Sequence, residues 1–291
     1  MNVLNPDQQQ FYHEHGYLGL PGLVSADWLE RLNAAAERAV DDSRETSETN
    51  AWLDVEDDHS PDNPRLRRLM KPQDYDPVFW EFASQGPFVD LAEDLLGPNI
   101  RFHHGKLNFK WSGGGAEVKW HQDIPFWPHT SYNVLTLGVA LDAIDDVMGP
   151  MGILPGSHKG PIYDHYAEDG HWQGYIRATE SAELALDSVD YLQGPAGTVT
   201  IHHCRAVHGS RPNAHPSRPR PLLLFAYSNA ASLPIMPYNQ DSAHNGAIVR
   251  GRHPDFPEID PEPCPLPPMR TLGPYRSIFA SQQGEDTATR T

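Results

Sequence analysis

Hydrophobic positions recur at helical spacing in the first third of the chain and gather in short extended runs after it. Leu29, Leu32, Ala36 and Ala39 would share one face of a helix that Ser25 can cap. We expect helices at residues 6–15, after residue 25, and near 77–84 and 87–96, with a short strand at 16–20 and a polar surface loop at 42–64.

The pattern changes near residue 99, where β-rich runs begin to alternate with Gly/Pro turns. These runs lie at residues 100–111, 118–123, 134–141, 197–202 and 221–228. Short strands that are separated by turns indicate an antiparallel sandwich or jelly roll. The expected fold class is therefore mainly β with flanking helices.

The chain is expected to form one domain over residues 1–280. Its parts would be a helical region at about 1–98, a β core at about 99–230 and a Pro-rich extension at about 231–280, followed by a frayed tail at 281–291. So many prolines at 253–268 exclude a central strand there. Residues 160–190 are rich in Tyr, His, Asp and Glu, and form either a lid or a surface excursion.

Composition narrows the class of partner. The formal charge is −17, from 22 basic and 39 acidic residues, which disfavours nucleic acid and leaves a small molecule as the expected ligand. Two cysteines do not make a disulfide framework, and no long apolar run suggests a membrane span or a secretion signal. We expect a cytoplasmic protein, and the residues do not indicate its oligomeric state.

One triplet carries the candidate chemistry. His121 and Asp123 are two residues apart, so in an extended strand both side chains would face the same way. His208, within a Gly-Ser context, can supply a third ligand. Two histidines and one carboxylate cover one face of an octahedron and leave positions open, as non-haem Fe(II) oxygenases require. The same set also suits Zn²⁺.

Several motifs in series resemble the phytanoyl-CoA dioxygenase family of Fe(II)/2-oxoglutarate oxygenases, over roughly residues 8–230. The matching elements are His121-x-Asp123, Gly149-Pro150-Met151, Pro155-Gly156-Ser157-His158, Gly197-Thr198, His208-Gly209-Ser210-Arg211-Pro212-Asn213 and Arg220. The resemblance implies a double-stranded β-helix (a cupin-like jelly roll), an iron centre, 2-oxoglutarate as cosubstrate and O2 as oxidant. The run from Asn108 to His121, with Trp127, is also similar to ectoine hydroxylases, but their longer acidic signature is absent.

The resemblance also assigns roles. His121, Asp123 and His208 would bind iron. Arg220 would hold the distal carboxylate of 2-oxoglutarate, since a guanidinium offers two parallel donors, and Arg218 is its rival. Lys110 and Ser210 would contact the same cosubstrate. In related halogenases a small residue replaces the aspartate, so its presence here favours hydroxylation.

Other residues leave alternatives open. Trp127, His129 and Tyr132 suit core packing and substrate lining equally well, and Arg205 suits a surface ion pair better than a substrate contact. Neighbouring histidines point to opposite faces of a strand, so at most one of each pair at 103–104 and 202–203 would face inward.

The expected activity is oxidation of a C–H bond in a small metabolite or natural-product intermediate, with release of succinate and CO2. The alternatives are a cupin-like metal-dependent hydrolase and a catalytically silent metal-binding protein. Retention of Arg220 and Lys110 argues against the hydrolase, because hydrolysis needs no dicarboxylate anchor, and the complete triad argues against the silent protein.

Overall fold

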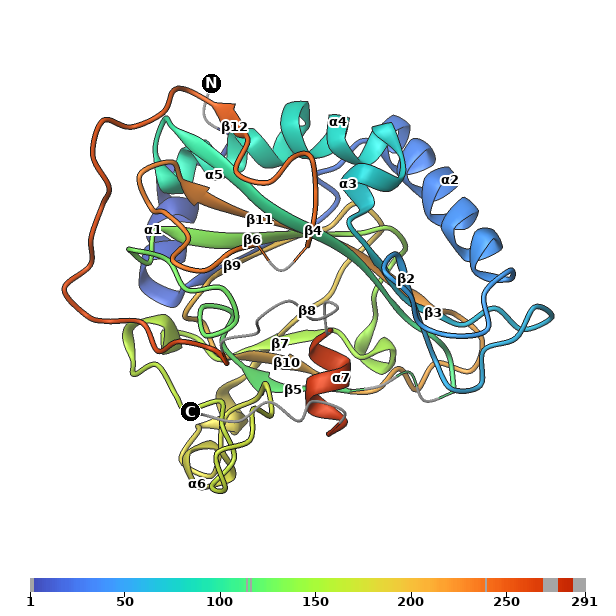
Figure 1. The fold of residues 1–291 in the computed structure, drawn as a ribbon. Helices are drawn as coiled ribbons and strands as arrows, with labels where there is room; N and C mark the ends of the chain where they lie inside the picture. Colours follow the sequence, from blue (N-terminus) through green and yellow to red (C-terminus); the bar gives the residue numbers. More distant parts are fainter. Residues whose placement is uncertain (1–2, 114, 116, 239, 269–276, 285–291) are drawn as a thin grey trace.

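The computed structural model describes residues 3–113, 115, 117–238, 240–268 and 277–284, and it contains two facing β-sheets (Figure 1). The larger sheet has the strand order β1-β9-β6-β11-β4-β3-β2, with β12 also paired to β4. The smaller sheet has the order β5-β10-β7-β8. Every strand pair is antiparallel, as the expected jelly roll requires.

The larger sheet holds the long strands. It comprises β1 (Tyr17–Leu20), β2 (Leu53–Val55), β3 (Leu66–Met70), β4 (Ile100–Lys110), β6 (Val134–Ala140), β9 (Val199–His203), β11 (Arg220–Asn229) and β12 (Ile248–Arg250). The smaller sheet comprises β5 (Val118–His121), β7 (Met151–Ile153), β8 (Asp190–Leu192) and β10 (His208–Ser210).

Most helices lie on the outer side of the larger sheet, whereas the two short helices at Ala178–Ser181 and Ile278–Gln282 lie on the side of the smaller sheet (Figure 1). The helices are α1 (Pro6–His15), α2 (Ala26–Ser43), α3 (Pro72–Tyr75), α4 (Pro77–Gln85), α5 (Pro87–Leu96), α6 (Ala178–Ser181) and α7 (Ile278–Gln282), with short 3-10 turns at Asp146–Met148, Ser157–Lys159 and Leu186–Ser188. Ser25 caps α2 and Asn5 caps α1, as their sequence context predicts. The described residues contain no helix that is long and apolar enough to span a membrane.

Strand β11 joins the helical layer to the interior between the sheets. Leu223, Phe225 and Tyr227 belong to the main hydrophobic core with the helices, whereas Leu222 and Leu224 pack in a separate interior cluster. Arg220 has the same parity as this second pair, so the alternation of the strand directs its side chain toward the interior. The pattern of β11 therefore sets the position of a residue predicted to bind cosubstrate.

A β-bulge interrupts the alternation of β4. Tyr227 of β11 pairs with Phe102 and Ala226 pairs with His104, which leaves His103 without a partner in the register. Core residues accordingly switch from even positions, Ile100 and Phe102, to odd positions, Leu107 and Phe109. A bulge places two consecutive residues opposite one. This explains why His103 and His104 both face the interior, contrary to the prediction that one of them would point away.

Two strands in the N-terminal third were not predicted. The polar segment 42–64 contains β2, and β3 follows it with two arginines among its five buried residues. The two arginines hid β3 in the sequence, because charged residues usually lie at the surface. Here their side chains are hydrogen-bonded inside the fold. Arg67 donates to Asp54 on the neighbouring strand at 2.7 Å, and Arg68 donates to Asn108 at 2.7 Å.

The C-terminal region differs from expectation in one respect. Residues 253–268 form no strand, as their prolines predict, and the structure describes all of them. The predicted frayed tail began at 281, but Ser281 and Gln282 are buried within α7, so that boundary was wrong. Residues 285–291 lie outside the described residues.

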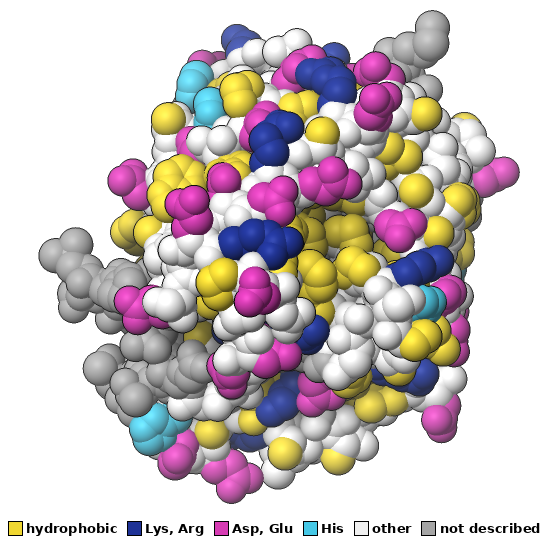
Figure 2. Space-filling view, turned by 90° about the vertical axis from the view of Figure 1, so that its right-hand side faces the viewer, with side chains coloured by type: hydrophobic (Ala, Val, Ile, Leu, Met, Phe, Trp, Pro, Cys, Tyr) yellow, Lys and Arg dark blue, Asp and Glu magenta, His cyan; other side chains and the backbone are white. Residues whose placement is uncertain are grey.

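The surface carries charges of both signs. Figure 2 shows carboxylates interspersed with basic side chains on one face, around a hollow in which hydrophobic side chains are visible.

The central position of β11 makes its core residues important for stability. Leu223 is fully buried in the main core, so Leu223→Ala should lower the free energy of unfolding by about 2–5 kcal/mol. Urea unfolding followed by circular dichroism measures this change. Val147→Ala is the control, because Val147 is 48% exposed and its loss should change stability by less than about 0.5 kcal/mol. Equal effects of the two substitutions would contradict this placement of the core.

Candidate metal centre and adjoining cavities

The two histidines of the predicted triad face each other across neighbouring strands. His121 of β5 and His208 of β10 are Cα partners in the register, and their ring centroids lie 4.0 Å apart. The Nδ1 atom of His121 lies 2.8 Å from the carbonyl oxygen of Lys119, and that of His208 lies 3.0 Å from the carbonyl oxygen of Ala206. A carbonyl only accepts, so each Nδ1 must carry the proton and each Nε2 keeps its lone pair for a metal.

Asp123 completes the cluster from just beyond the end of β5. Its Oδ1 lies 4.0 Å from Nε2 of His121 and 3.9 Å from Nε2 of His208. The other carboxylate oxygen, Oδ2, accepts a hydrogen bond from Thr136 at 2.8 Å and lies 3.1 Å from Nε2 of His202. The larger sheet therefore holds one oxygen of Asp123 and leaves the other facing the two imidazoles.

These three side chains form a buried metal-ligand cluster. One ligand atom from each of His121, Asp123 and His208 lies within 4.8 Å of the others, and all three residues are buried. Two neutral imidazole nitrogens and one carboxylate oxygen suit a divalent transition metal such as Fe(II). The cluster fits the ion that the family resemblance implies.

Burial and local charge set the protonation states that metal binding needs. Burial lowers the pKa of His121 to about 4 and holds the pKa of His208 well below its usual value, so both rings are neutral near pH 7. Burial opposes ionisation of Asp123, but the charge of nearby Lys106 and the hydrogen bond with His202 outweigh it and lower the pKa of this carboxyl group. The triad is therefore ready to bind a cation.

Gln122, between two of these residues, faces the opposite way and is fully buried. Its side chain donates to the carbonyl oxygens of Pro161 and Arg205 and accepts from the backbone N–H of Tyr163. Its own N–H donates to Nε2 of His165. Residues near 160–165 thus support the triplet from behind. None of the described residues that line the two cavities discussed next comes from 160–190.

One small cavity extends from the two histidines toward the start of β11. Its volume is about 60 Å³, and it is lined by Arg68, Lys106, Asn108, Val118, His121, Met151, His202, His208, Gly209, Ser210, Arg220, Leu222, Leu224 and Ile278. Arg220 is 4% exposed, and its Nε has no hydrogen-bond partner among the described residues. An orphaned buried guanidinium nitrogen beside the cluster is what a carboxylate ligand would satisfy.

The rival arginine lies elsewhere. The guanidinium of Arg218 donates to the carbonyl oxygen of Ala143 at 2.9 Å and lies about 4 Å from the carboxylates of Asp142 and Asp145. It does not line either of the two cavities. The geometry therefore favours Arg220 over Arg218 as the anchor.

The two other predicted cosubstrate residues differ in position. Ser210 lines the cavity, whereas Lys110 does not. The Lys110 ammonium instead donates to the backbone carbonyls of Ser210 and Arg211. Lys110 is the Cα partner of Arg220, so its ammonium lies beside the cavity wall while serving the backbone of the strand that carries His208.

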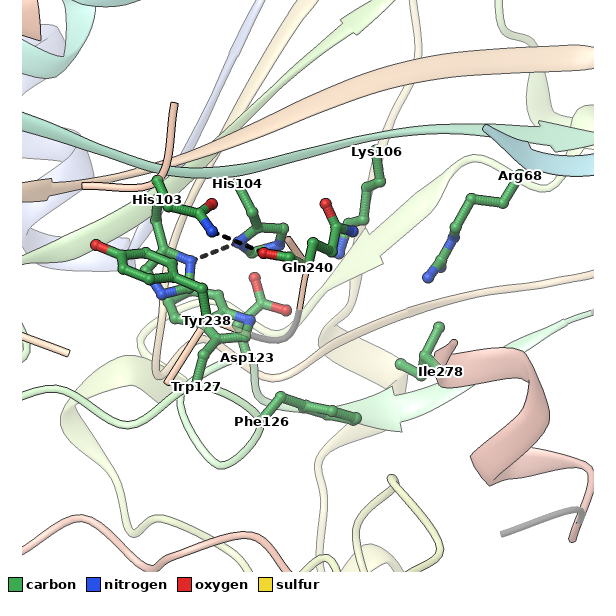
Figure 3. A pocket seen from close by; sticks show the side chains of 11 residues that line it. Arg68, His103, His104, Lys106, Asp123, Phe126, Trp127, Tyr238, Gln240 and Ile278 are labelled. Carbon is green, nitrogen blue, oxygen red and sulfur yellow. Dashed lines mark hydrogen bonds between the residues drawn. The ribbon is translucent and has the colours of Figure 1, made fainter. Parts of the chain in front are cut away.

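A second cavity of about 60 Å³ lies on the other side of Asp123 (Figure 3). It is lined by Arg68, His103, His104, Lys106, Asp123, Phe126, Trp127, Tyr238, Gln240, Asn245 and Ile278. Figure 3 shows Lys106 and Arg68 extending toward this space from the strands above it, with Asp123 and Phe126 below and Ile278 of α7 at one side. Residues of the C-terminal region therefore close the site.

The predicted substrate residues divide between this cavity and its surroundings. Trp127 lines it. His129 packs against His103 behind the wall, and Tyr132 donates to the carbonyl oxygen of Glu262. Arg205 forms an ion pair with Glu262 at 2.7 Å and stacks over Tyr132, so neither Tyr132 nor Arg205 reaches the cavity. The ion-pair interpretation of Arg205 is confirmed.

Several lining residues were missed in the sequence. Lys106 shares the parity of Lys110 on β4, so the strand pattern alone could have placed it inward. Arg68 lies on a strand that was not predicted, and Tyr238 and Gln240 lie in the Pro-rich extension, which carried no periodic signal.

Comparison with known proteins gives a consistent picture. The model of the family described as Phytanoyl-CoA dioxygenase (PhyH) matches residues 12–221. A probable alpha-ketoglutarate-dependent hypophosphite dioxygenase from Stutzerimonas stutzeri is 35% identical over 281 residues, covering 95% of this chain and 96% of that protein. L-proline trans-4-hydroxylase from Streptomyces griseoviridis is 28% identical over 257 residues, covering 81% and 92% of the two chains.

A solved structure supports the fold. The crystal structure of EctD from S. alaskensis with bound Fe superimposes with a TM-score of 0.69 at 23% identity, covering 87% of this chain and 89% of that one. These relatives are oxygenases, which speaks against the hydrolase alternative. The match over residues 12–221 and the near full-length relative lead to one conclusion: the chain belongs to the phytanoyl-CoA dioxygenase family and is an iron- and 2-oxoglutarate-dependent dioxygenase.

Proposed function

We propose that this enzyme oxidises a small molecule at an Fe(II) ion held by Nε2 of His121, Nε2 of His208 and Oδ1 of Asp123. The observation that carries this assignment is the convergence of three buried ligand atoms within 4.8 Å. The bound ion, with 2-oxoglutarate and O2, supplies the oxidising chemistry and yields succinate and CO2. Asp123 would fill a coordination position of the metal that a small residue leaves open in related halogenases. We therefore expect hydroxylation rather than halogenation.

We further propose that Arg220 and Ser210 bind 2-oxoglutarate in the cavity beside His208. The guanidinium of Arg220 would donate two hydrogen bonds to the distal carboxylate, which would satisfy its free Nε. Lys110 supports this site as a second cation next to Arg220, and burial and the Arg220 charge both lower its pKa. A contact between Lys110 and the cosubstrate would require release of one of its two carbonyl partners.

The second cavity is the proposed substrate site, with Trp127 in its wall. Asp123 lines it, so a molecule bound there would lie next to the metal. His129, Tyr132 and Arg205 act on this site only through the residues they pack against.

The relatives suggest candidates for the substrate. One is named for hypophosphite and another for L-proline, both of which are small. Hypophosphite is the first compound to test, because its named relative covers nearly the whole chain. We place the reaction in the cytoplasm and treat residues 1–280 as one oxygenase domain. Two free cysteines in the described structure agree with a reducing compartment.

Turnover tests the proposed function directly. With Fe(II), O2 and 2-oxoglutarate, a substrate such as hypophosphite should stimulate succinate release, measured by liquid chromatography. Asp123→Gly removes a metal ligand and should abolish this substrate-dependent oxidation. Retained oxidation in that variant would count against Asp123 as a ligand.

The affinity for 2-oxoglutarate shows whether Arg220 or Arg218 is the cosubstrate anchor. Adding 2-oxoglutarate to the anaerobic Fe(II) protein should produce a metal-to-ligand charge-transfer band. Arg220→Ala should raise the 2-oxoglutarate concentration for half-saturation by roughly 10-fold or more, because it removes a charge-assisted pair. Arg218→Ala is the matched control and should change it by less than about 3-fold. The opposite ranking would exchange the two assignments.

Thr136, which donates a hydrogen bond to Oδ2 of Asp123, should affect the affinity of the site for Fe(II). Thr136→Val removes its hydrogen bond to Oδ2 and should weaken Fe(II) binding by about 10–100-fold in competition with a chromophoric chelator. Thr200→Val is the control, since Thr200 is buried on the adjacent strand and its hydroxyl has no partner in the described structure. If both variants bind Fe(II) like the parent protein, the hydrogen bond does not position the ligand.

A further inference from the structure

Lys106 is a cation near Asp123 that makes no direct polar contact in the described structure. It lines both cavities from β4, between the metal cluster and the proposed substrate space. Its ammonium has no hydrogen bond or ion pair to any described residue, whereas Lys110 on the same strand donates to two carbonyls. An ammonium in a confined site is costly unless an anion or several acceptors contact it.

Gln240 adds an unsatisfied amide to the same cavity. Its side chain is only 5% exposed, and neither its Nε2 nor its Oε1 has a hydrogen-bond partner in the described structure. Figure 3 shows Gln240 next to Lys106 in the cavity. A buried primary amide with both groups free is rare, because each unmade bond costs free energy. A polar ligand beside Lys106 would satisfy it.

The charges of the site favour a negative ligand. Fe(II) and 2-oxoglutarate carry equal and opposite charges, so their binding leaves the balance of the surrounding side chains unchanged. Arg68, Lys106 and Arg220 line the cavities, while Asp123 is the one carboxylate among their described lining residues. Two positive charges therefore remain after Asp123 is counted. A negatively charged substrate would offset this excess.

Apolar side chains form part of the wall of this cavity. Phe126, Trp127 and Ile278 line it and supply no charge. The polar groups gather on one side, around Lys106 and Gln240 (Figure 3). This arrangement suits a compact molecule with one anionic group.

Building on the proposed function, we propose that the substrate is a compact oxyanion, of the size of a phosphinate or a short phosphonate, bound by the ammonium of Lys106 and the amide of Gln240. Lys106 is then the residue that sets specificity for charge. A tetrahedral oxyanion has at least two acceptor oxygens, so it can accept from both donors while its oxidisable bond points toward Asp123 and the metal.

An isosteric pair of probes tests the role of charge. Dimethylphosphinate and dimethyl sulfone have nearly the same shape, but only the first is an anion. Each is titrated, together with sodium hypophosphite, into the anaerobic Fe(II) protein saturated with 2-oxoglutarate, and the charge-transfer band is followed. We expect hypophosphite and dimethylphosphinate to shift the band and dimethyl sulfone to leave it unchanged at the same concentrations. Equal responses to phosphinate and sulfone would overturn the proposal.

Variants of Lys106 test its assignment. Lys106→Met should weaken hypophosphite binding by about 10-fold or more, and Lys106→Arg should retain most of it. In Lys106→Met the loss of hypophosphite affinity should exceed any loss of 2-oxoglutarate affinity, although Lys106 lines both cavities. Lys159→Met, which removes an exposed lysine outside the site, is the control and should bind like the parent. Loss of 2-oxoglutarate affinity in Lys106→Met, with anion binding intact, would assign Lys106 to the cosubstrate and overturn the proposal.

The same titration separates this proposal from the one it rests on. If 2-oxoglutarate produces no charge-transfer band in the parent protein, the proposed function itself fails. If the band forms but none of the anions shifts it, the enzyme assignment stands and the oxyanion proposal is wrong.

Discussion

The register between β5 and β10 is the constraint on which the site depends. It sets His121 directly opposite His208, and the smaller sheet has only short strands to maintain it. A slip of one residue would turn one imidazole to the other face. Gln122 opposes such a slip, because it is hydrogen-bonded to three backbone groups behind the strand. The residue between the two ligands is therefore structural, while its neighbours face the metal position.

The two sheets contribute different parts of the chemistry. The smaller sheet carries the imidazoles, whose protonation is fixed by backbone carbonyls. The larger sheet carries Thr136 and His202, which orient Asp123, and also the cations Arg220 and Lys106. Because the two sheets face each other, the metal ligands and the anion-binding groups lie together between them. Helix α7 completes the enclosure, with Ile278 in the wall of both cavities.

The sequence predicted the parts whose signals are local. The triad, Arg220 and the long strands follow from spacing, alternation and family motifs. The bulge at His103 could not be predicted from the alternation of side chains along the strand. Its one extra residue exchanges the inward-facing and outward-facing positions that follow. Strand β3 was hidden for a related reason: Arg67 and Arg68 look like surface residues until Asp54 and Asn108 are seen beside them. The wall residues Tyr238, Gln240, Asn245 and Ile278 come from a region without periodicity.

A crystal structure of the Fe(II) protein with anomalous scattering at the iron edge would show whether His121, Asp123 and His208 hold the iron. We expect one strong peak bonded to Nε2 of both histidines and to Oδ1 of Asp123, with Oδ2 still bonded to Thr136. Iron at another position, or bound through Nδ1 of either histidine, would exclude this ligand set.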